Sequence, residues 1–148
     1  MLRWLLASGH LLAFGIGLGA IWVRARSLRA VPDPAALGRA LRADAWWGIA
    51  ALLWIGTGVP RLLLGTEKPT DYYLASHLFW VKMLLFLGIL LLEIGPAVAL
   101  TRWRLALRRN LAPDTARAGR WAVFSRAEFV LVLVMLFVAT AVARAMGV

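Results

Sequence analysis

Four long apolar stretches, separated by shorter polar segments, dominate the pattern of residues along the chain. They cover residues 2–23, 45–64, 74–100 and 127–146. Each stretch is long enough to provide the ~20 apolar residues that a helix needs to cross a bilayer. Short connections place successive helices side by side. The pattern therefore predicts one all-α transmembrane domain over residues 1–148, an antiparallel four-helix bundle.

The composition supports a membrane protein and excludes several other classes. Of the 148 residues, 62% are hydrophobic and 16% are charged, whereas a soluble domain carries roughly 25% charged residues. This balance excludes an ordinary soluble enzyme and a disordered chain. The chain has no cysteine, which excludes disulfide scaffolds, thiolate metal sites and a cysteine nucleophile.

The net charge of +10 is concentrated in two of the three connections. Five arginines lie in residues 24–44 and seven in residues 101–126, whereas residues 65–73 hold one lysine. Because short loops rich in Lys and Arg stay cytoplasmic, we expect both termini to face outward. The Ala- and Arg-rich composition favours a bacterial inner membrane, with the termini in the periplasm. The lipid bilayer is the expected partner of the basic residues, and nucleic acid is not.

Local features refine this picture at the ends of the spans. Asp33 is placed to cap a short helix over residues 34–41, which is expected to lie on the membrane surface. Tryptophans near the span ends, among them Trp47 and Trp103, are expected to lie at the membrane interfaces, where aromatic belts form.

Glycines indicate which spans pack closely. Gly15 and Gly19 form a small-xxx-small pair in the first span, and the second span also contains small residues, among them Gly48 and Gly56. We therefore expect the first two spans to pack tightly against each other. The fourth span has no glycine before Gly147. We therefore expect the fourth span to face lipid more than the others do.

Ionisable side chains at membrane depth are costly, so they are the candidates for function. His10 in the first span and Lys82 in the third each lie about 12 Å below the outward surface. Arg61 and His77 are nearer to the outward ends of their spans. These four side chains, with Thr57 one turn below Arg61, are expected to lie around one polar site, while His77 is rotated by about 140° from Lys82 on the same helix. A structural role stays open for each: a buried hydrogen bond for His10, and an interfacial position for the others.

Glu93 belongs to a second layer, toward the cytoplasmic side. It follows Lys82 by eleven residues, so the two side chains share a helix face about 16 Å apart and do not pair directly. Arg126 and Arg102 are the expected partners of Glu93, in an ion pair that either locks the helix register or takes part in a relay. No carboxylate pair, Ser/His/Asp set or phosphate loop marks a catalytic centre, so catalytic residues stay unassigned.

A resemblance to known proteins rests on motifs spread over nearly the whole chain: His10 with residues 15–20, then residues 44–51, 54–58 and 67–68, Tyr73, residues 77–79 and 82–83, Glu93 and Pro96. They are similar to those of a bacterial family of predicted four-span membrane proteins of unknown function. More distantly, the chain resembles HemJ-type membrane protoporphyrinogen oxidase and the membrane domain of CopD-like copper-resistance proteins. That resemblance implies that His10 and Lys82 lie near a bound haem b. The HemJ-type third span carries a further His where this chain has Glu93, so haem or porphyrin binding is implied rather than the oxidase reaction.

These observations leave three hypotheses for the function. In the first, His10 is the axial ligand of haem b or a related porphyrin, with Lys82, Arg61 and His77 around it and the cations near the propionates. In the second, the chain is a non-catalytic subunit of a larger membrane complex or a homodimer. In the third, it is a small transporter or proton conductor that uses His10, Lys82 and Glu93 as a relay.

Overall fold

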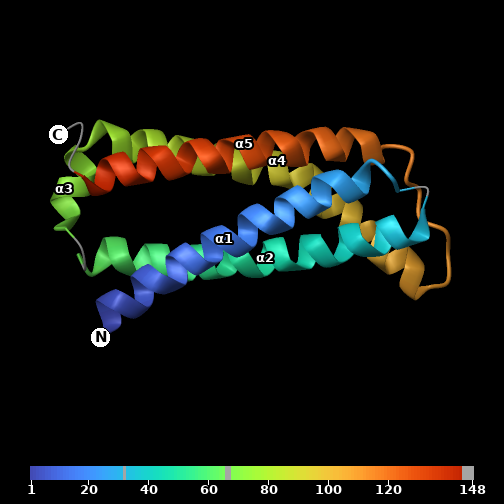
Figure 1. Cartoon of the computed structure of the whole chain (residues 1–148), viewed down its shortest axis with the longest axis horizontal. Coiled ribbons are helices and arrows are strands. Elements are labelled where there is room, and N and C mark those ends of the chain that lie inside the picture. Colours follow the sequence, from blue (N-terminus) through green and yellow to red (C-terminus); the bar gives the residue numbers. More distant parts are fainter. Residues whose placement is uncertain (32, 66–67, 145–148) are drawn as a thin grey trace.

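The computed structural model of the protein describes residues 1–31, 33–65 and 68–144. Within these ranges it is all-α and contains no strand. The elements are α1 (Leu2–Leu28), α2 (Pro34–Leu63), the short α3 (Thr70–Ala75), α4 (His77–Arg108) and α5 (Ala118–Ala143). Figure 1 shows the four long helices alongside one another. The start of α1, the end of α5 and α3 lie at one end of the molecule, and the α1–α2 and α4–α5 connections lie at the other.

The long helices form two pairs rather than a closed arrangement. α1 packs along α2, α4 packs along α5, and the contact between α1 and α5 joins the two pairs. α2 and α4 meet at only a few positions. The successive long helices are antiparallel, as expected (Figure 1). The expected four-helix bundle is therefore not confirmed, because α2 and α4 meet too little to complete it.

The start of α2 differs from the expectation in one respect. Asp33 caps the helix as predicted, since its carboxylate accepts hydrogen bonds from the amides of Ala35 and Ala36 at 3.0 and 3.1 Å. Residues 34–41 do not form a separate surface helix. They are the first turns of α2 itself, because no helix-breaking residue separates them from the second apolar stretch.

The helices formed by the last two apolar stretches also begin at other residues than predicted. The third stretch is broken at Ser76, whose backbone is extended and whose hydroxyl accepts a hydrogen bond from the amide of Phe79 as the cap of α4. The helix of the fourth stretch, α5, begins at Ala118, nine residues before the expected start of its span. The predicted end of that span, at Met146, lies outside the described residues.

Gly17, rather than Gly15 or Gly19, is the glycine at the contact between α1 and α2. A Cβ atom on Gly17 would lie 2.9 Å from Cζ3 of Trp47, whereas one on Gly15 or Gly19 would meet nothing within 4 Å. Trp47 and Trp103 are each 4% exposed. They are therefore part of the interior and not of an interfacial belt, because small residues on neighbouring helices leave room for their rings.

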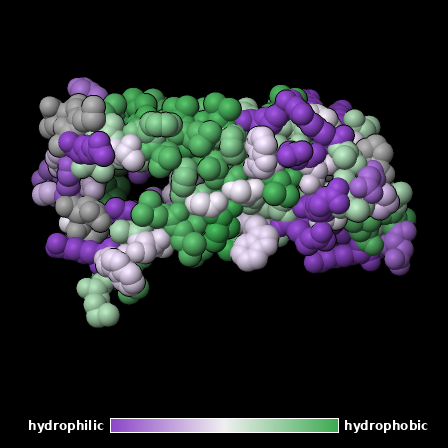
Figure 2. All heavy atoms as spheres, in the orientation of Figure 1, coloured by the Kyte–Doolittle hydropathy of each residue, from purple (hydrophilic) through white to green (hydrophobic). Residues whose placement is uncertain are grey.

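The surface of the long helices is strongly apolar. Leu52 is 74% exposed and Phe137 is 72% exposed, and Figure 2 shows a broad hydrophobic zone between two more hydrophilic ends. By length and composition α1, α4 and α5 are able to cross a membrane, and only 17–28% of their apolar windows is buried inside the protein. Monomeric soluble proteins do not expose apolar surface on this scale. α5 is the most buried of the three, so it does not face lipid more than the others do.

Two apolar cores lie along the molecule with a charged layer between them. The first core is made of Ala13, Ala20, Ile21, Trp47, Ala50, Trp54, Ile89, Val132 and Met135. The second, nearer to the basic connections, is made of Leu28, Val31, Leu37, Ala40, Leu100, Trp103, Ala118 and Ala122. Between the two sets lie Arg24 of α1, Asp44 of α2, Glu93 of α4 and Glu128 of α5.

Candidate functional site

Arg24 is the centre of the charged layer. It lies one turn before the end of α1, and its side chain is fully buried. A guanidinium has five N–H donors, and each of the five has an acceptor here. Nε donates to Ser125 Oγ at 3.0 Å. Nη1 donates to Asp44 and Glu93 at 2.8 and 2.9 Å, and Nη2 donates to Glu93 and Glu128 at 2.7 and 2.5 Å.

These bonds join all four long helices. Asp44 comes from α2, Glu93 from α4, and Ser125 and Glu128 from α5. Asp44 also pairs with Arg104 of α4, whose Nη2 lies 2.7 Å from Asp44 Oδ2. We call Arg24, Asp44, Glu93, Arg104 and Glu128 the ionic cluster. Because its members come from both helix pairs, the ionic cluster holds the pairs together at the end near the basic connections.

The structure corrects the predicted partner of Glu93. The carboxylate takes both Nη1 and Nη2 of Arg24, while Arg126 is exposed on α5. Sequence reasoning placed Arg24 in a loop, but α1 continues four residues beyond it and keeps it inside the protein. A signal for a buried arginine was present in the sequence. Three acidic residues lie in or beside apolar stretches, and they require a cation at the same depth.

His10 and Lys82 mark a second polar site, nearer to the end where α1 begins. Thr57 Oγ1 donates to the carbonyl of Leu53 at 2.6 Å, so it accepts from His10 Nδ1 at 2.9 Å. In a neutral ring this assigns the proton to Nδ1 and makes Nε2 the acceptor nitrogen. The ring also lies against Gly58, where a Cβ atom would be 3.1 Å from His10 Cε1.

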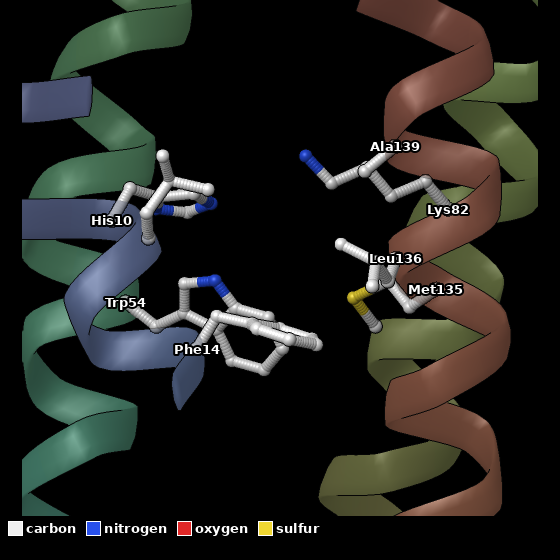
Figure 3. A pocket seen from close by; sticks show the side chains of 8 residues that line it. His10, Phe14, Trp54, Lys82, Met135, Leu136 and Ala139 are labelled. Atoms are coloured by element: carbon white, nitrogen blue, oxygen red, sulfur yellow. The ribbon is translucent and has the colours of Figure 1, made fainter. Parts of the chain in front are cut away.

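A small cavity separates His10 from Lys82. Its volume is about 60 Å³, and it is lined by His10, Leu11, Phe14, Trp54, Lys82, Met135, Leu136 and Ala139. Figure 3 shows His10, Phe14 and Trp54 on one side and Lys82, Met135, Leu136 and Ala139 on the other. The Lys82 amine points across the gap toward His10. We call this space the outer cavity; it lies between the two helix pairs.

The other predicted residues of this site lie around the outer cavity rather than in it. Arg61 does not line the cavity, but its charge is close enough to act on both His10 and Lys82. His77 is exposed at the first position of α4 and takes no part in the cavity. The predicted convergence is therefore found for His10 and Lys82, with Arg61 nearby.

The outer cavity does not fit haem b. Sites for drug-sized ligands have volumes of roughly 300–1,000 Å³, and a porphyrin needs a volume within that range. The cavity has about 60 Å³. The neutral imidazole with Nδ1 held by Thr57 is a suitable metal ligand, but the walls formed by Phe14, Trp54 and Met135 leave no room for the macrocycle. With the side chains packed in this way, His10 and Lys82 do not frame a space for a porphyrin.

The two polar sites are separated by the first apolar core. Between His10 and Arg24, α1 contributes Ala13, Ala20 and Ile21, and between Lys82 and Glu93, α4 contributes Ile89. A proton relay needs a chain of polar groups or water. The described side chains between the two sites are apolar, so the geometry does not support the relay from Lys82 to Glu93.

Comparison with known proteins identifies a family. A family model described as "Predicted membrane protein (DUF2214)" matches residues 2–147, which is nearly the whole chain. No curated protein and no solved structure matches the chain. The match to the family model agrees with the apolar surface of the long helices, and the chain belongs to the DUF2214 family of predicted membrane proteins.

Proposed function

We propose that the chain crosses the membrane four times, through α2 in addition to α1, α4 and α5. α2 has 30 residues and packs along α1. Trp46, Thr57 and Arg61 lower its hydropathy, but an antiparallel partner covers part of its surface. The basic connections then lie together on the cytoplasmic side of a bacterial plasma membrane, and α3 with the start of α1 faces outward.

This topology gives a direct prediction, because the natural chain has no cysteine. Ala75 and Ala112 are both exposed and lie at opposite ends of the molecule. We expect a membrane-impermeant maleimide to label Ala75→Cys in intact cells with the outer membrane permeabilised. Ala112→Cys should be labelled only after the inner membrane is opened. The reverse pattern, or labelling of both variants in intact cells, would contradict the topology.

We further propose that the outer cavity binds a small anion, with Lys82 as its counter-ion. The observation that carries this proposal is the Lys82 amine, which points into the cavity (Figure 3). Among the described residues no carboxylate pairs with it. An ammonium group without a counter-ion at membrane depth is costly. Arg61 adds positive charge to the same region.

The shape and lining of the outer cavity limit the class of ligand. About 60 Å³ is roughly the volume of two water molecules, which is room for a carboxylate group. The cavity is not enclosed, so a short carbon chain can extend beyond it. Leu11, Phe14, Trp54, Met135 and Leu136 give the cavity apolar walls. A short aliphatic carboxylate offers both a charge for Lys82 and an apolar chain for these walls. The proposed function is therefore the binding of a small carboxylate from the outward side.

The test compares three probes that share a four-carbon chain and carry a negative, a neutral and a positive polar group: butyrate, butanol and butylamine. We expect calorimetric titration of the purified protein in nanodiscs to detect butyrate and neither of the other two. Lys82→Met should weaken butyrate binding at least about tenfold, because the charge-assisted bond is worth more than ~1.4 kcal/mol in a desolvated site.

The chain provides a matched control for this substitution. Its other lysine, Lys68, lies over the ring of Tyr72 at 4.1 Å and outside the outer cavity. Lys68→Met should leave butyrate binding unchanged. Equal affinity of Lys82→Met and the natural protein for butyrate, or equal binding of butylamine, would exclude the proposal.

A further inference from the structure

The ionic cluster has an excess of acidic groups. It contains three carboxyl groups, those of Asp44, Glu93 and Glu128, and two guanidinium groups, those of Arg24 and Arg104. If all five were ionised, the cluster would carry one net negative charge between two apolar cores. An unbalanced charge in such surroundings is strongly unfavourable, whereas a carboxyl group that takes up one proton balances the cluster.

The hydrogen bonds indicate which carboxyl group carries the proton. Both oxygens of Glu93 accept from Arg24, and both oxygens of Asp44 face a guanidinium. Glu128 uses only Oε2; its Oε1 is buried and has no hydrogen-bond partner among the described residues. An ionised carboxylate oxygen in that position gives up its hydrogen bonds to water and gains no hydrogen bond from the protein in return. A neutral carboxylic acid that accepts through Oε2 and carries its proton on Oε1 costs less.

We propose that the ionic cluster is a proton-binding site, with the proton on Glu128. The groups that face Glu128 come from every long helix: Arg24 from α1, Asp44 beyond it from α2, Glu93 and Arg104 from α4, and Ser125 from α5. The site is independent of the outer cavity, because the first apolar core lies between them.

A second cavity gives the cluster a route to its surroundings. It has a volume of about 330 Å³ and lies in the open seam between α2 and α4. Asp44, Glu93, Thr101 and Arg104 are among its lining residues. The side chain of Glu93 is 19% exposed, and its Oε2 contacts the same Arg24 nitrogen as Glu128 Oε2. A proton therefore reaches Glu128 through the side of the cluster that Glu93 occupies.

Proton binding at this position is coupled to the contact between the helix pairs. Release of the proton leaves a net negative charge at the junction, and separation of the pairs exposes that charge to water. The folded, closed state therefore binds one proton more than the unfolded state, in which a glutamate is ionised at neutral pH. By linkage, stability then falls as the pH rises, for as long as Glu128 stays protonated in the folded protein.

Infrared spectroscopy tests the proton directly. A protonated carboxyl group gives a C=O stretching band that is separate from carboxylate bands and shifts in D₂O. We expect this band in the natural protein at neutral pH, its loss in Glu128→Gln, and its retention in Asp71→Asn, which removes an exposed carboxyl group. Absence of the band from the natural protein would overturn the proposal whether or not the variants fold.

Unfolding in mixed micelles provides a second readout. For the natural protein the unfolding constant should rise about tenfold per pH unit from the ordinary pKa of glutamate, about 4.3, up to the pH at which Glu128 loses its proton in the folded protein. Over that range one proton is released on unfolding. Glu128→Gln keeps the shape of the neutral acid and should lose this dependence, whereas Asp71→Asn should keep it. A pH-independent natural protein that is stabilised by Na⁺ would instead assign the excess charge to a bound metal cation and would contradict the proposal.

Discussion

Arg24→Met is expected to lower the free energy of unfolding by about 3–5 kcal/mol, the typical cost of breaking a buried ion pair by removing one partner. The substitution keeps much of the volume of the side chain but removes all five N–H donors. Asp44, Glu93 and Glu128 then lose a shared cation, and Glu128 loses the hydrogen bond that Arg24 donates to its Oε2. Because the partners belong to all four long helices, the loss weakens the junction of the two pairs.

Arg24→Lys is expected to recover little of this stability. An ammonium group has three donors on one atom, and it lacks the planar fork that binds Glu93 through two nitrogens. It does not reach Ser125, Asp44, Glu93 and Glu128 at the same time. A lysine variant that is nearly as stable as the natural protein would show that charge alone, and not the geometry of the guanidinium, holds the cluster.

The control for these variants is Arg26→Met. Arg26 is exposed two residues away on the same helix and lies 6.0 Å from the ring of Trp22, a contact worth about 0.5–1 kcal/mol. The measurement is unfolding in mixed micelles, followed by circular dichroism. Equal losses in Arg24→Met and Arg26→Met would contradict the role assigned to Arg24.

Gly95→Ala is expected to be the second most damaging change, with a loss of about 1–3 kcal/mol, as for other overpacked interiors. A Cβ atom on Gly95 would lie 2.5 Å from Cζ3 of Trp121 and 3.0 Å from its Cη2. The ring lies across α4 at this point, in the contact between α4 and α5, so either the ring or the helix has to move.

Gly56→Ala is the matched control, because it makes the same change in another long helix. A Cβ atom on Gly56 would meet nothing within 4 Å, and alanine favours a helix by about 1 kcal/mol relative to glycine. We expect Gly56→Ala to be neutral or stabilising in the same unfolding measurement. If Gly95→Ala were also neutral, the close approach of Trp121 to α4 would not be part of the folded state.

The sequence predicted the number of long helices and their antiparallel succession well, because long apolar stretches with short connections are strong signals. It also predicted that the first two spans pack closely, which the contact between α1 and α2 confirms. It predicted the residues that make this contact less well. The spacing of Gly15 and Gly19 indicated a contact that is made by Gly17, since the rotation of α1 depends on its partners and not on its own pattern. Asp33 was predicted correctly as a cap because a cap is determined by its nearest neighbours in the chain.

The candidate site shows the same limit. His10 and Lys82 were recognisable as polar residues at membrane depth, and the structure places both on one cavity. The ionic cluster was missed because Arg24 directly follows an apolar stretch and was therefore assigned to a loop. The members of the cluster come together only where four helices meet at one level. The size of the outer cavity, which decides against haem b, is likewise a property of packed side chains.

The distance between a bound carboxylate and Lys82 tests the proposed binding site in the outer cavity most directly. The chain has two lysines, Lys68 and Lys82, so labelling lysine with ¹⁵N at Nζ gives two ammonium signals, and Lys68→Met leaves the signal of Lys82. Solid-state NMR with butyrate labelled with ¹³C at its carboxyl group measures the carbon–nitrogen distance. If the carboxylate binds Lys82 directly, this distance is about 3–4 Å, the separation in an ammonium–carboxylate bond. Butyrate that binds without dipolar coupling to Lys82 Nζ would contradict the proposed binding site.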